Sequence, residues 1–539
     1  MSNETTNFSR RGFIKTSAGV SGGLIIGFMM PAYAGRLKNF LPDPGAVIFA
    51  PNAFLRIGTD NSIKILLAHA EMGQGIWTTL TMLLGEELDA DWKNISVEHA
   101  PPAKEYFHTQ WGAQMTGGSS TTYSEFDRYR KAGATARILL TEAAAKKWKV
   151  AASECKTENG FVIHGNKKLS YGQLAESASK LTAPAEVPLR TKEQWKYIGK
   201  GMKRLDAPEK VNGKAIFGID VKVEGMKIAV VAHPPVMGGT VKSFDASKAK
   251  QVSGVVDVVQ IPTGIAVLAD NTWAALEGKK ALVVNWDLGE NVSVNSATQF
   301  DEFRKFATEG GKEVKKGGDV AAAIPQAAKT IESEFTLPYL AHAAMEPMNC
   351  TVKITGDKCE IWTGSQMPGF DQAAAAKILG LKPEQVTLNT TFLGGGFGRR
   401  ATMISDFVSE AVHIAKASGR TIKMTWTRED DTQGGYYRPS FLHRIKAGID
   451  SNGMPLFWKH VMVGQALPGD DGNGSAEGIS DSPYLSAIPN YHISQYAPKL
   501  GITTLWLRSV GHTHTAFAME SMMDELAHLA GKDPVEYRL

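Results

Sequence analysis

The sequence predicts a multidomain α+β protein in which strands and helices are joined by glycine-rich turns. Its 539 residues exceed the usual size of one domain. An alternating apolar pattern typical of a strand, then a glycine turn, then a helical pattern, recurs along the chain. A glycine turn at the start of a helix presents backbone N–H groups that can bind an oxyanion. Three such turns therefore indicate a protein that binds a phosphate-bearing cofactor.

The most distinctive turn is Thr391–Arg400, which reads Thr-Phe-Leu-Gly-Gly-Gly-Phe-Gly-Arg-Arg. A strand pattern over residues 386–392 precedes it, and a helical stripe over residues 404–419 follows. Cations are disfavoured at the positive end of a helix, so Arg399 and Arg400 there predict a nearby anion. The alternative is a glycine-rich turn with two solvated arginines. Neither a Walker A loop nor a Gly-x-Gly-x-x-Gly dinucleotide turn fits this spacing.

Composition excludes some classes of partner. The chain is 43% hydrophobic and 21% charged, with a formal net charge of +4 and no lysine-rich run, so nucleic acid is excluded as a partner. The three cysteines, Cys155, Cys350 and Cys359, are scattered without metal-ligand spacing. We therefore expect no iron–sulfur cluster on this chain.

The N-terminus carries a pattern typical of an export signal. Residues 9–15 read Ser-Arg-Arg-Gly-Phe-Ile-Lys, which resembles a twin-arginine signal, and a weakly apolar run follows over residues 17–30. That run is shorter than the about 20 residues needed to span a bilayer, which disfavours the alternative of a membrane anchor. Ala32-Tyr33-Ala34 fits a cleavage site, so residues 1–34 are predicted to be a signal peptide. The mature protein is expected in the periplasm or on the periplasmic face of the inner membrane, exported already folded.

Several of these motifs resemble one family. Gly-Gly-Gly-Phe-Gly followed by a basic residue resembles the hallmark of the molybdenum-binding large subunits of the xanthine dehydrogenase/aldehyde oxidase family. Met72–Gly75, Met-Gly-Gln-Gly, resembles a second motif, which contacts the pterin or its phosphate. Thr116–Thr122, Thr-Gly-Gly-Ser-Ser-Thr-Thr, is similar to the family's phosphate-binding segment, with simple helix capping as the alternative. Gly364-Ser365-Gln366 resembles the segment whose glutamine lies beside the molybdenum.

The resemblance implies a set of site residues. Arg508 matches an arginine segment near the substrate, and no side chain is expected to ligate the metal directly. Ala401 stands where purine-oxidising members carry an acid, which favours an aldehyde or an N-heterocyclic aromatic substrate. The cofactor-binding residues implied are Gly73, Gln74, Gly75, Gly118, Ser119, Ser120, Gln366, Gly395, Gly396, Phe397, Gly398 and Arg399.

The order of the motifs predicts the domain layout. The Met-Gly-Gln-Gly segment lies near the N-terminus, which resembles the isoquinoline oxidoreductase branch and its exported aldehyde dehydrogenase relatives. The resulting α+β architecture would combine cofactor-binding α/β domains with a small α/β hammerhead domain. The expected segments are the signal peptide at 1–34, an N-terminal molybdopterin-binding segment at 35–190, the hammerhead domain at 196–294, a linker at 295–330, and a molybdopterin-binding domain at 331–539 that is incomplete at its C-terminus.

Two further motifs contain residues that could belong to a catalytic or metal site. Glu346 lies in a Glu-Pro-x-Asn turn, where a structural carboxylate is favoured over a catalytic acid. His512 and His514 invite a metal interpretation, but no third ligand is evident and ordinary loop histidines are favoured.

The family implies the remaining chemistry. The cofactor would be molybdopterin, in its cytosine dinucleotide form, and a glutamate beyond Leu539 would act as general base, so that this chain alone is expected to be inactive. Electrons would pass to a small subunit with two [2Fe–2S] clusters, and a cytochrome c is a candidate acceptor beyond it. The alternative function is a non-catalytic assembly or cofactor-binding subunit of an exported complex.

Overall fold

The chain folds into two compact units, which are described separately. The computed structural model describes residues 23–27, 53–468 and 474–539. Unit 1 contains the described residues up to Glu224 with Asn349–Gly395 and Met403–Lys416, and unit 2 contains Gly225–Met348, Gly396–Thr402 and Ala417–Leu539. Helices and sheets occur in both units, which confirms the predicted α+β multidomain class.

The predicted signal peptide at 1–34 lies outside the described residues except for strand β1 (Gly23–Gly27), so export stays a prediction. Within the described ranges, no helix is long and apolar enough to cross a membrane.

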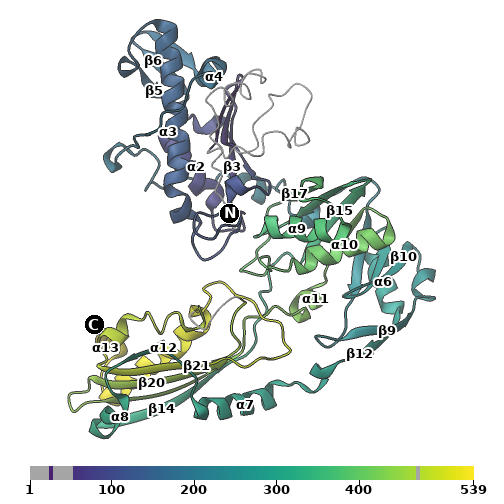
Figure 1. Ribbon diagram of the computed structural model, residues 1–539, viewed down its shortest axis with the longest axis vertical. Helices are drawn as coiled ribbons and strands as arrows, with labels where there is room; N and C mark the ends of the chain where they lie inside the picture. The colour runs from purple at the N-terminus through teal and green to yellow at the C-terminus, as the bar shows by residue number, and fades with distance from the viewer. Residues whose placement is uncertain (1–22, 28–52, 469–473) are drawn as a thin grey trace, which may run out of the picture. The chain divides into compact units, whose positions relative to one another are not determined.

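The first part of unit 1 is a four-stranded sheet covered by helices. The strand order is β1-β2-β3-β4, with β2 antiparallel to β3 and β3 parallel to β4. Helices α2 and α3 lie side by side against it (Figure 1). Leu55, Leu80 and Leu140, one each from β2, α2 and α3, are fully buried in the shared core. The bounds are β2 Ala53–Gly58, β3 Ile63–Leu67, α2 Ile76–Leu88, β4 Ile95–His99, α3 Thr121–Trp148, β5 Lys156–Glu158, β6 Phe161–His164, β7 Lys167–Ser170, α4 Tyr171–Ser179 and α5 Ala207–Val211.

The second part of unit 1 is formed by the later chain segments. Strands β15 (Asn349–Thr355) and β16 (Lys358–Thr363) form an antiparallel pair, and β17 (Val386–Thr390) is parallel to β16. Helix α9 (Pro368–Leu379) connects β16 to β17, as parallel strands require a crossover. Helix α10 (Asp406–Ser418) follows the glycine-rich loop.

Unit 2 begins with a small α/β arrangement. Strands β10, β11, β8 and β18 are neighbours in that order, while β9 pairs with β12. The bounds are β8 Lys227–Ala232, β9 Thr240–Asp245, β10 Val255–Ile261, β11 Gly264–Ala269, α6 Thr272–Ala281, β12 Val283–Asp287, β18 Ile422–Thr425 and α11 Arg428–Gln433.

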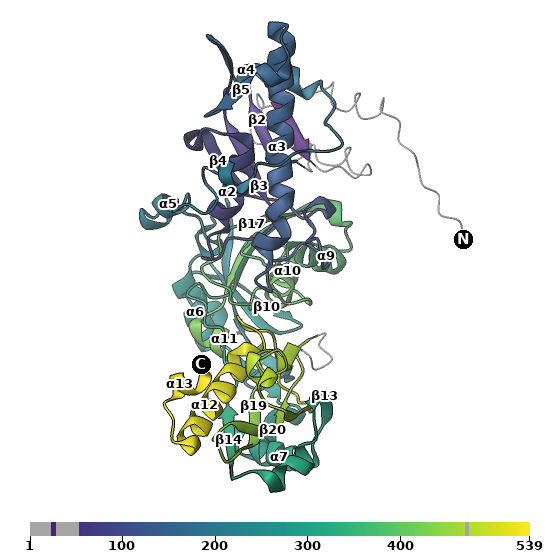
Figure 2. The same cartoon turned by 90° about the vertical axis from the view of Figure 1, so that its left-hand side faces the viewer.

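A five-stranded sheet in the order β13-β21-β20-β19-β14 forms the rest of unit 2. Helix α12 packs on one face of this sheet and α7 on the other (Figure 2). Successive residues of a strand point to opposite faces, and the central strands carry apolar residues on both, so each face can bury a helix. The bounds are α7 Ser296–Glu309, β13 Lys312–Gly317, α8 Val320–Ala323, β14 Lys329–Leu337, β19 Phe441–Ile449, β20 Pro455–Gly464, β21 Asn490–Tyr496, α12 His512–Ala530 and α13 Pro534–Arg538.

The expected linker at 295–330 is instead folded structure. Helix α7 begins after Asn295, whose side chain caps it, and strand β13 pairs with β21. Although the segment is polar on average, α7 has one apolar face, on which Phe303 is fully buried. The unit boundary also differs from the predicted domains, because the chain enters unit 2 at Gly225 rather than near residue 196.

Candidate functional site

The Met-Gly-Gln-Gly turn of unit 1 is organised around one buried carboxylate. Glu71 has no exposed surface, and its Oε1 accepts hydrogen bonds from the N–H groups of Gly73 at 2.8 Å and Gly75 at 3.2 Å. Its Oε2 accepts from the N–H of Trp77, in the first turn of α2, at 3.0 Å. Both glycines have positive φ, which bends the backbone round the carboxylate. The N–H groups predicted to bind a cofactor phosphate here are therefore engaged by Glu71.

The side chain of Gln74 is folded back onto its own turn. Its Oε1 accepts from the N–H of Met72 at 2.7 Å, and its Nε2 donates to the carbonyl of Ala70 at 2.8 Å. Arg204 closes the turn from outside, donating to the carbonyl of Gly73 and to Glu71 at 3.0 and 3.1 Å. The structure thus gives Gln74 a role in shaping the turn.

Arg204 is itself fixed by a second acid. It forms an ion pair with the buried Asp206 at 2.6 Å, and Lys210 donates to the same carboxylate at 2.6 Å. Burial opposes the ionisation of Asp206, but the hydrogen bonds from Arg204 and Lys210 lower its pKa to about 2. The sequence analysis placed this segment only within the predicted domain at 196–294, because the contacts of its charged residues with Glu71 are created by the fold and leave no mark in the sequence spacing.

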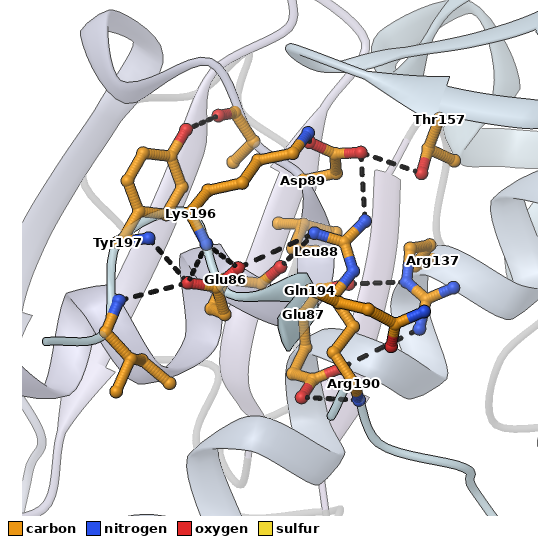
Figure 3. A network of polar contacts seen from close by, with 12 residues as sticks. Glu86, Glu87, Leu88, Asp89, Arg137, Thr157, Arg190, Gln194, Lys196 and Tyr197 are labelled. Atoms are coloured by element: carbon orange, nitrogen blue, oxygen red, sulfur yellow. Dashed lines mark hydrogen bonds and ion pairs between the residues drawn. The ribbon is translucent and has the colours of Figure 1, made fainter. Parts of the chain in front are cut away.

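The chain that leads toward Arg204 is tied down at the end of α2 (Figure 3). Three acids there have almost no exposed surface: Glu86, Glu87 and Asp89. Glu86 accepts three successive backbone N–H groups from Lys196 onward, and Glu87 accepts the backbone N–H of Arg190. Asp89 accepts from the side chains of Arg190 at 3.0 Å and Lys196 at 2.8 Å. The network is a structural clamp, since each acid is neutralised by a cation or by N–H donors.

The Thr116–Ser120 turn of unit 1 keeps open donors. Gly118 and Ser119 have φ values of 59° and 53°, and their N–H groups have no partner among the residues the structure describes. Ser120 donates its hydroxyl proton to the carbonyl of Gly117 and contacts His108 Nε2, both at 2.8 Å. This turn precedes α3, so its N–H groups have the geometry that oxyanion binding needs, and the binding itself stays a prediction.

Gln366 links this turn to the strand layer of unit 1. The N–H of Thr116 donates to the carbonyl of Gln366, and Gln366 Nε2 donates to the carbonyl of Thr116, both at 2.8 Å. Thr116 Oγ1 also accepts from the N–H of Ala70, next to Glu71, at 2.9 Å. Gln366 is 2% exposed, and its Oε1 is buried without a hydrogen-bond partner. A buried unpartnered oxygen is costly, which favours a ligand at this position.

The first half of the glycine-rich loop reaches the same region of unit 1. The N–H of Leu393, just before Gly394 and Gly395, donates to the carbonyl of Glu71 at 3.3 Å. Phe392 packs on Trp77 with ring centroids 4.7 Å apart. Unit 1 therefore brings together Gly73–Gly75, Gly118–Ser120, Gln366 and Gly395, which are far apart in the sequence.

The two arginines of the loop differ from their prediction. Helix α10 begins only at Asp406, so Arg399 and Arg400 do not lie at its N-terminus. Both are buried, which excludes solvated arginines. Arg400 Nη2 donates to the carbonyl oxygen and to Oε2 of Glu346, each at 2.9 Å, so its anion is a side chain of unit 2 itself. The structural role predicted for Glu346 agrees with this pair.

Arg399 is held by rings. Its guanidinium lies over Trp426 and Tyr436, at 5.3 and 4.8 Å from the ring centroids, a cation–π arrangement.

The second half of the loop lies in unit 2 with Arg508. Phe397 has φ of 57° and accepts a backbone hydrogen bond from the N–H of Arg508 at 2.7 Å. Gly398 has φ of +111°, and a Cβ there would lie 2.3 Å from the carbonyl of Trp506. The glycine is thus required by close packing of backbone on backbone. The side chain of Arg508 is exposed beside this loop.

The histidines near the C-terminus are not loop residues. His512 and His514 lie on α12, and His514 is buried, with its Nδ1 3.0 Å from His443 Nε2. His443 Nδ1 lies 2.9 Å from His460 Nε2, which completes a row of three imidazoles. Burial lowers the pKa of His443 to about 3, so the row is uncharged at neutral pH. Within the described ranges, no group of His, Cys, Asp or Glu has the arrangement of a metal site.

The residues of unit 1 fit a molybdopterin. The open N–H groups of Gly118 and Ser119 suit a phosphate oxygen, and the amide of Gln366 has a free oxygen and a second N–H. Glu71 has no capacity left for a general base, because its carboxylate already accepts three N–H groups and Arg204.

Comparisons with known proteins agree with this geometry. Models of the molybdopterin cofactor-binding domain match residues 9–233 and residues 299–539. Isoquinoline 1-oxidoreductase subunit beta of Brevundimonas diminuta is 30% identical, and the match covers 99% of this chain and 75% of that protein. Membrane-bound aldehyde dehydrogenase [pyrroloquinoline-quinone] of Gluconacetobacter polyoxogenes is also 30% identical, over 99% of this chain and 72% of that protein.

A solved structure shares the fold. Quinoline 2-oxidoreductase from Pseudomonas putida 86 matches with a TM-score of 0.51 and 18% identity, over 63% of this chain. The match spans 49% of the quinoline 2-oxidoreductase chain. Together with the two domain matches, these relatives show that the chain belongs to the molybdopterin-binding large subunits of the xanthine dehydrogenase/aldehyde oxidase family.

Proposed function

We propose that the chain is the cofactor-binding subunit of a molybdenum hydroxylase that oxidises an aldehyde or an N-heterocyclic aromatic compound with oxygen from water. Unit 1 supports the proposal most directly, because it gathers the cofactor motifs round Gln366, whose buried Oε1 has no partner. The names of relatives that act on isoquinoline and on aldehydes support the substrate classes. Ala401, in place of an acid, disfavours a purine.

The residues would divide the work of holding the cofactor. The N–H groups of Gly118 and Ser119 would bind a phosphate, at the positive end of α3. Glu71 would keep the backbone of Gly73–Gly75 in shape, and Gln366 would donate its second N–H toward the metal end. When bound, the cofactor supplies a redox-active metal that accepts two electrons from the substrate.

The finer assignments extend this proposal. The cytosine dinucleotide form of the cofactor, an iron–sulfur partner subunit and a cytochrome c acceptor rest on the family resemblance. Periplasmic localisation rests on the twin-arginine motif, and the name of the membrane-bound aldehyde dehydrogenase is compatible with it. Double substitution of Arg10 and Arg11 by lysine should abolish export, and undiminished periplasmic protein would contradict this assignment.

Elemental analysis of the purified protein tests the proposal. Stoichiometric molybdenum supports it, whereas a pyrroloquinoline quinone without molybdenum, the cofactor in the name of one relative, would overturn it. Gln366→Ala should lower the molybdenum content, while Gln326→Ala, at an exposed glutamine, should leave it unchanged. Full molybdenum occupancy without oxidation of either substrate class, in the presence of an artificial electron acceptor, would favour the non-catalytic assembly subunit.

A further inference from the structure

Asp371, which follows Gln366 in the sequence, has a buried carboxyl group. Asp371, in the first turn of α9, is 3% exposed. Its Oδ2 accepts the hydroxyl proton of Ser365 at 2.5 Å, and the same hydroxyl oxygen accepts from the N–H of Met367 at 3.0 Å. Gln366 therefore lies between Ser365, which carries this hydroxyl group, and Met367, whose N–H donates to it.

The surroundings of Asp371 are uncharged or acidic. The hydroxyl of Ser365 donates to the carboxyl group, and the hydroxyl of Ser405, just before α10, also favours the charged form. Asp406 of α10 repels that charge, and the buried thiol of Cys350 on β15 lies near enough for the carboxylate to raise the pKa of that thiol. Burial is the largest influence and raises the pKa of Asp371 to about 7, although the two hydroxyls act against it.

We propose that Asp371 is a positioning residue that fixes the 364–367 turn through Ser365, and that the strength of this hold on Gln366 depends on the charge of the Asp371 carboxyl group. An ionised carboxylate accepts a hydroxyl proton more strongly than a neutral carboxyl group does. Because Ser365 and Met367 flank Gln366, a stronger bond between Asp371 and Ser365 restrains the backbone of Gln366 directly.

The other side of Gln366 is fixed independently of pH. Its amide and carbonyl are bonded to Thr116, where no titrating group takes part. Loss of the Asp371 contact should therefore loosen the turn without removing Gln366 from the Thr116 segment. The importance of this for the cofactor rests on the proposed function, in which Gln366 faces the metal end.

Amide hydrogen exchange of the full chain tests whether Asp371 restrains the 364–367 turn, and it does not require the cofactor. At about pH 8.5 the N–H of Met367 should exchange about tenfold faster in Asp371→Asn than in the parent protein, and at about pH 5.5 the two should agree within about twofold. Comparison at matched pH cancels the intrinsic pH dependence of exchange. Asp357→Asn, an exposed carboxylate in the turn between β15 and β16, should leave this amide unchanged. Equal exchange of the parent and Asp371→Asn at about pH 8.5 would overturn the proposal.

Infrared spectroscopy follows the carboxyl group itself. The protonated carboxyl absorption of the parent should disappear over neutral pH, and that step should be missing in Asp371→Asn. Ser365→Ala, a second variant that keeps the acid, should move the step to higher pH because it removes a bond that favours the charged form. A step that stays in Asp371→Asn, or does not move in Ser365→Ala, would refute the assignment.

Molybdenum content separates this inference from the proposed function. Absence of molybdenum from the parent protein would end the proposed function, while the exchange and infrared results would still decide the role of Asp371. With molybdenum present, the paramagnetic signal of the partly reduced metal should change with pH in the parent and not in Asp371→Asn. The same pH-dependent signal in both would refute the link to Gln366.

Discussion

Substitution of Glu71 by glutamine should open the Met-Gly-Gln-Gly turn. The carboxylate accepts three N–H groups and the Arg204 guanidinium, and none of it is exposed. A glutamine keeps one acceptor oxygen, but its NH₂ group would face a backbone N–H, most directly that of Trp77. The change therefore leaves a buried donor unsatisfied and weakens the remaining bonds.

The expected cost follows from these contacts. A buried donor without a partner costs about 1–3 kcal/mol, and each bond that changes from a charged to a neutral acceptor loses about 1 kcal/mol. Arg204 keeps its ion pair with Asp206, so no cation is left without an anion. The sum is about 4 kcal/mol, a large fraction of the about 5–15 kcal/mol typical of domain stability.

Urea denaturation followed by circular dichroism measures this cost. The transition that includes unit 1 should move to lower urea in Glu71→Gln, and the molybdenum content should fall because the turn no longer holds its shape. Glu98→Gln is the matched control, since Glu98 is an exposed glutamate on β4 whose pair with Lys64 is at the surface. A loss below about 1 kcal/mol in Glu71→Gln, with full molybdenum occupancy, would refute the view that Glu71 organises the turn.

Three further predictions concern other buried groups. Arg400→Met should destabilise the protein by about 3–5 kcal/mol in thermal unfolding, because it removes the cation that neutralises Glu346, and adding Glu346→Gln should recover part of the loss; no recovery would contradict the pairing. Asp206 has a folded pKa of about 2, below the unfolded value, so it should contribute about 2 kcal/mol above about pH 4 that is lost as the pH falls toward 2. Asp206→Asn should flatten that part of the stability curve, and an unchanged slope would argue against its ion pairs. Gly398→Ala should cost about 3 kcal/mol, because the backbone is left-handed there and the new Cβ meets the carbonyl of Trp506, and wild-type stability would exclude this close approach.

Regular elements with a clear period could be predicted from the sequence. The strand expected over residues 386–392 is β17, Val386–Thr390, and the helix expected over residues 404–419 is α10, Asp406–Ser418. In both elements the apolar period of the sequence agrees with the burial in the fold, since Val386 and Leu388 of the strand and Phe407, Ala411 and Ile414 of the helix are buried.

Buried charges could not be predicted in the same way. The sequence placed Arg399 and Arg400 at a helix start and predicted an anion, yet the anion of Arg400 is Glu346, 54 residues earlier in the chain. Spacing carries no information about such a partner, since the pair is created by packing within unit 2. Asp371 gave no signal either, because a lone aspartate in the first turn of a helix has an ordinary local explanation.

The two glycine turns of unit 1 have a backbone conformation that the sequence predicts, but the partners of their N–H groups differ. Both have glycines at left-handed positions before a helix, and the sequence predicted the same N–H cradle for each. The N–H groups of Gly118 and Ser119 remain open, whereas those of Gly73 and Gly75 are closed by Glu71. The two sequences differ before the first glycine, where one turn has Glu71 and the other has Thr116. An acid at this place can itself accept the N–H groups of the turn, whereas a threonine carries no charge to neutralise them. An anion-binding turn is therefore better predicted when neither of the two residues before its first glycine is an acid, and by this rule the Thr116–Ser120 turn is the stronger candidate for the cofactor phosphate.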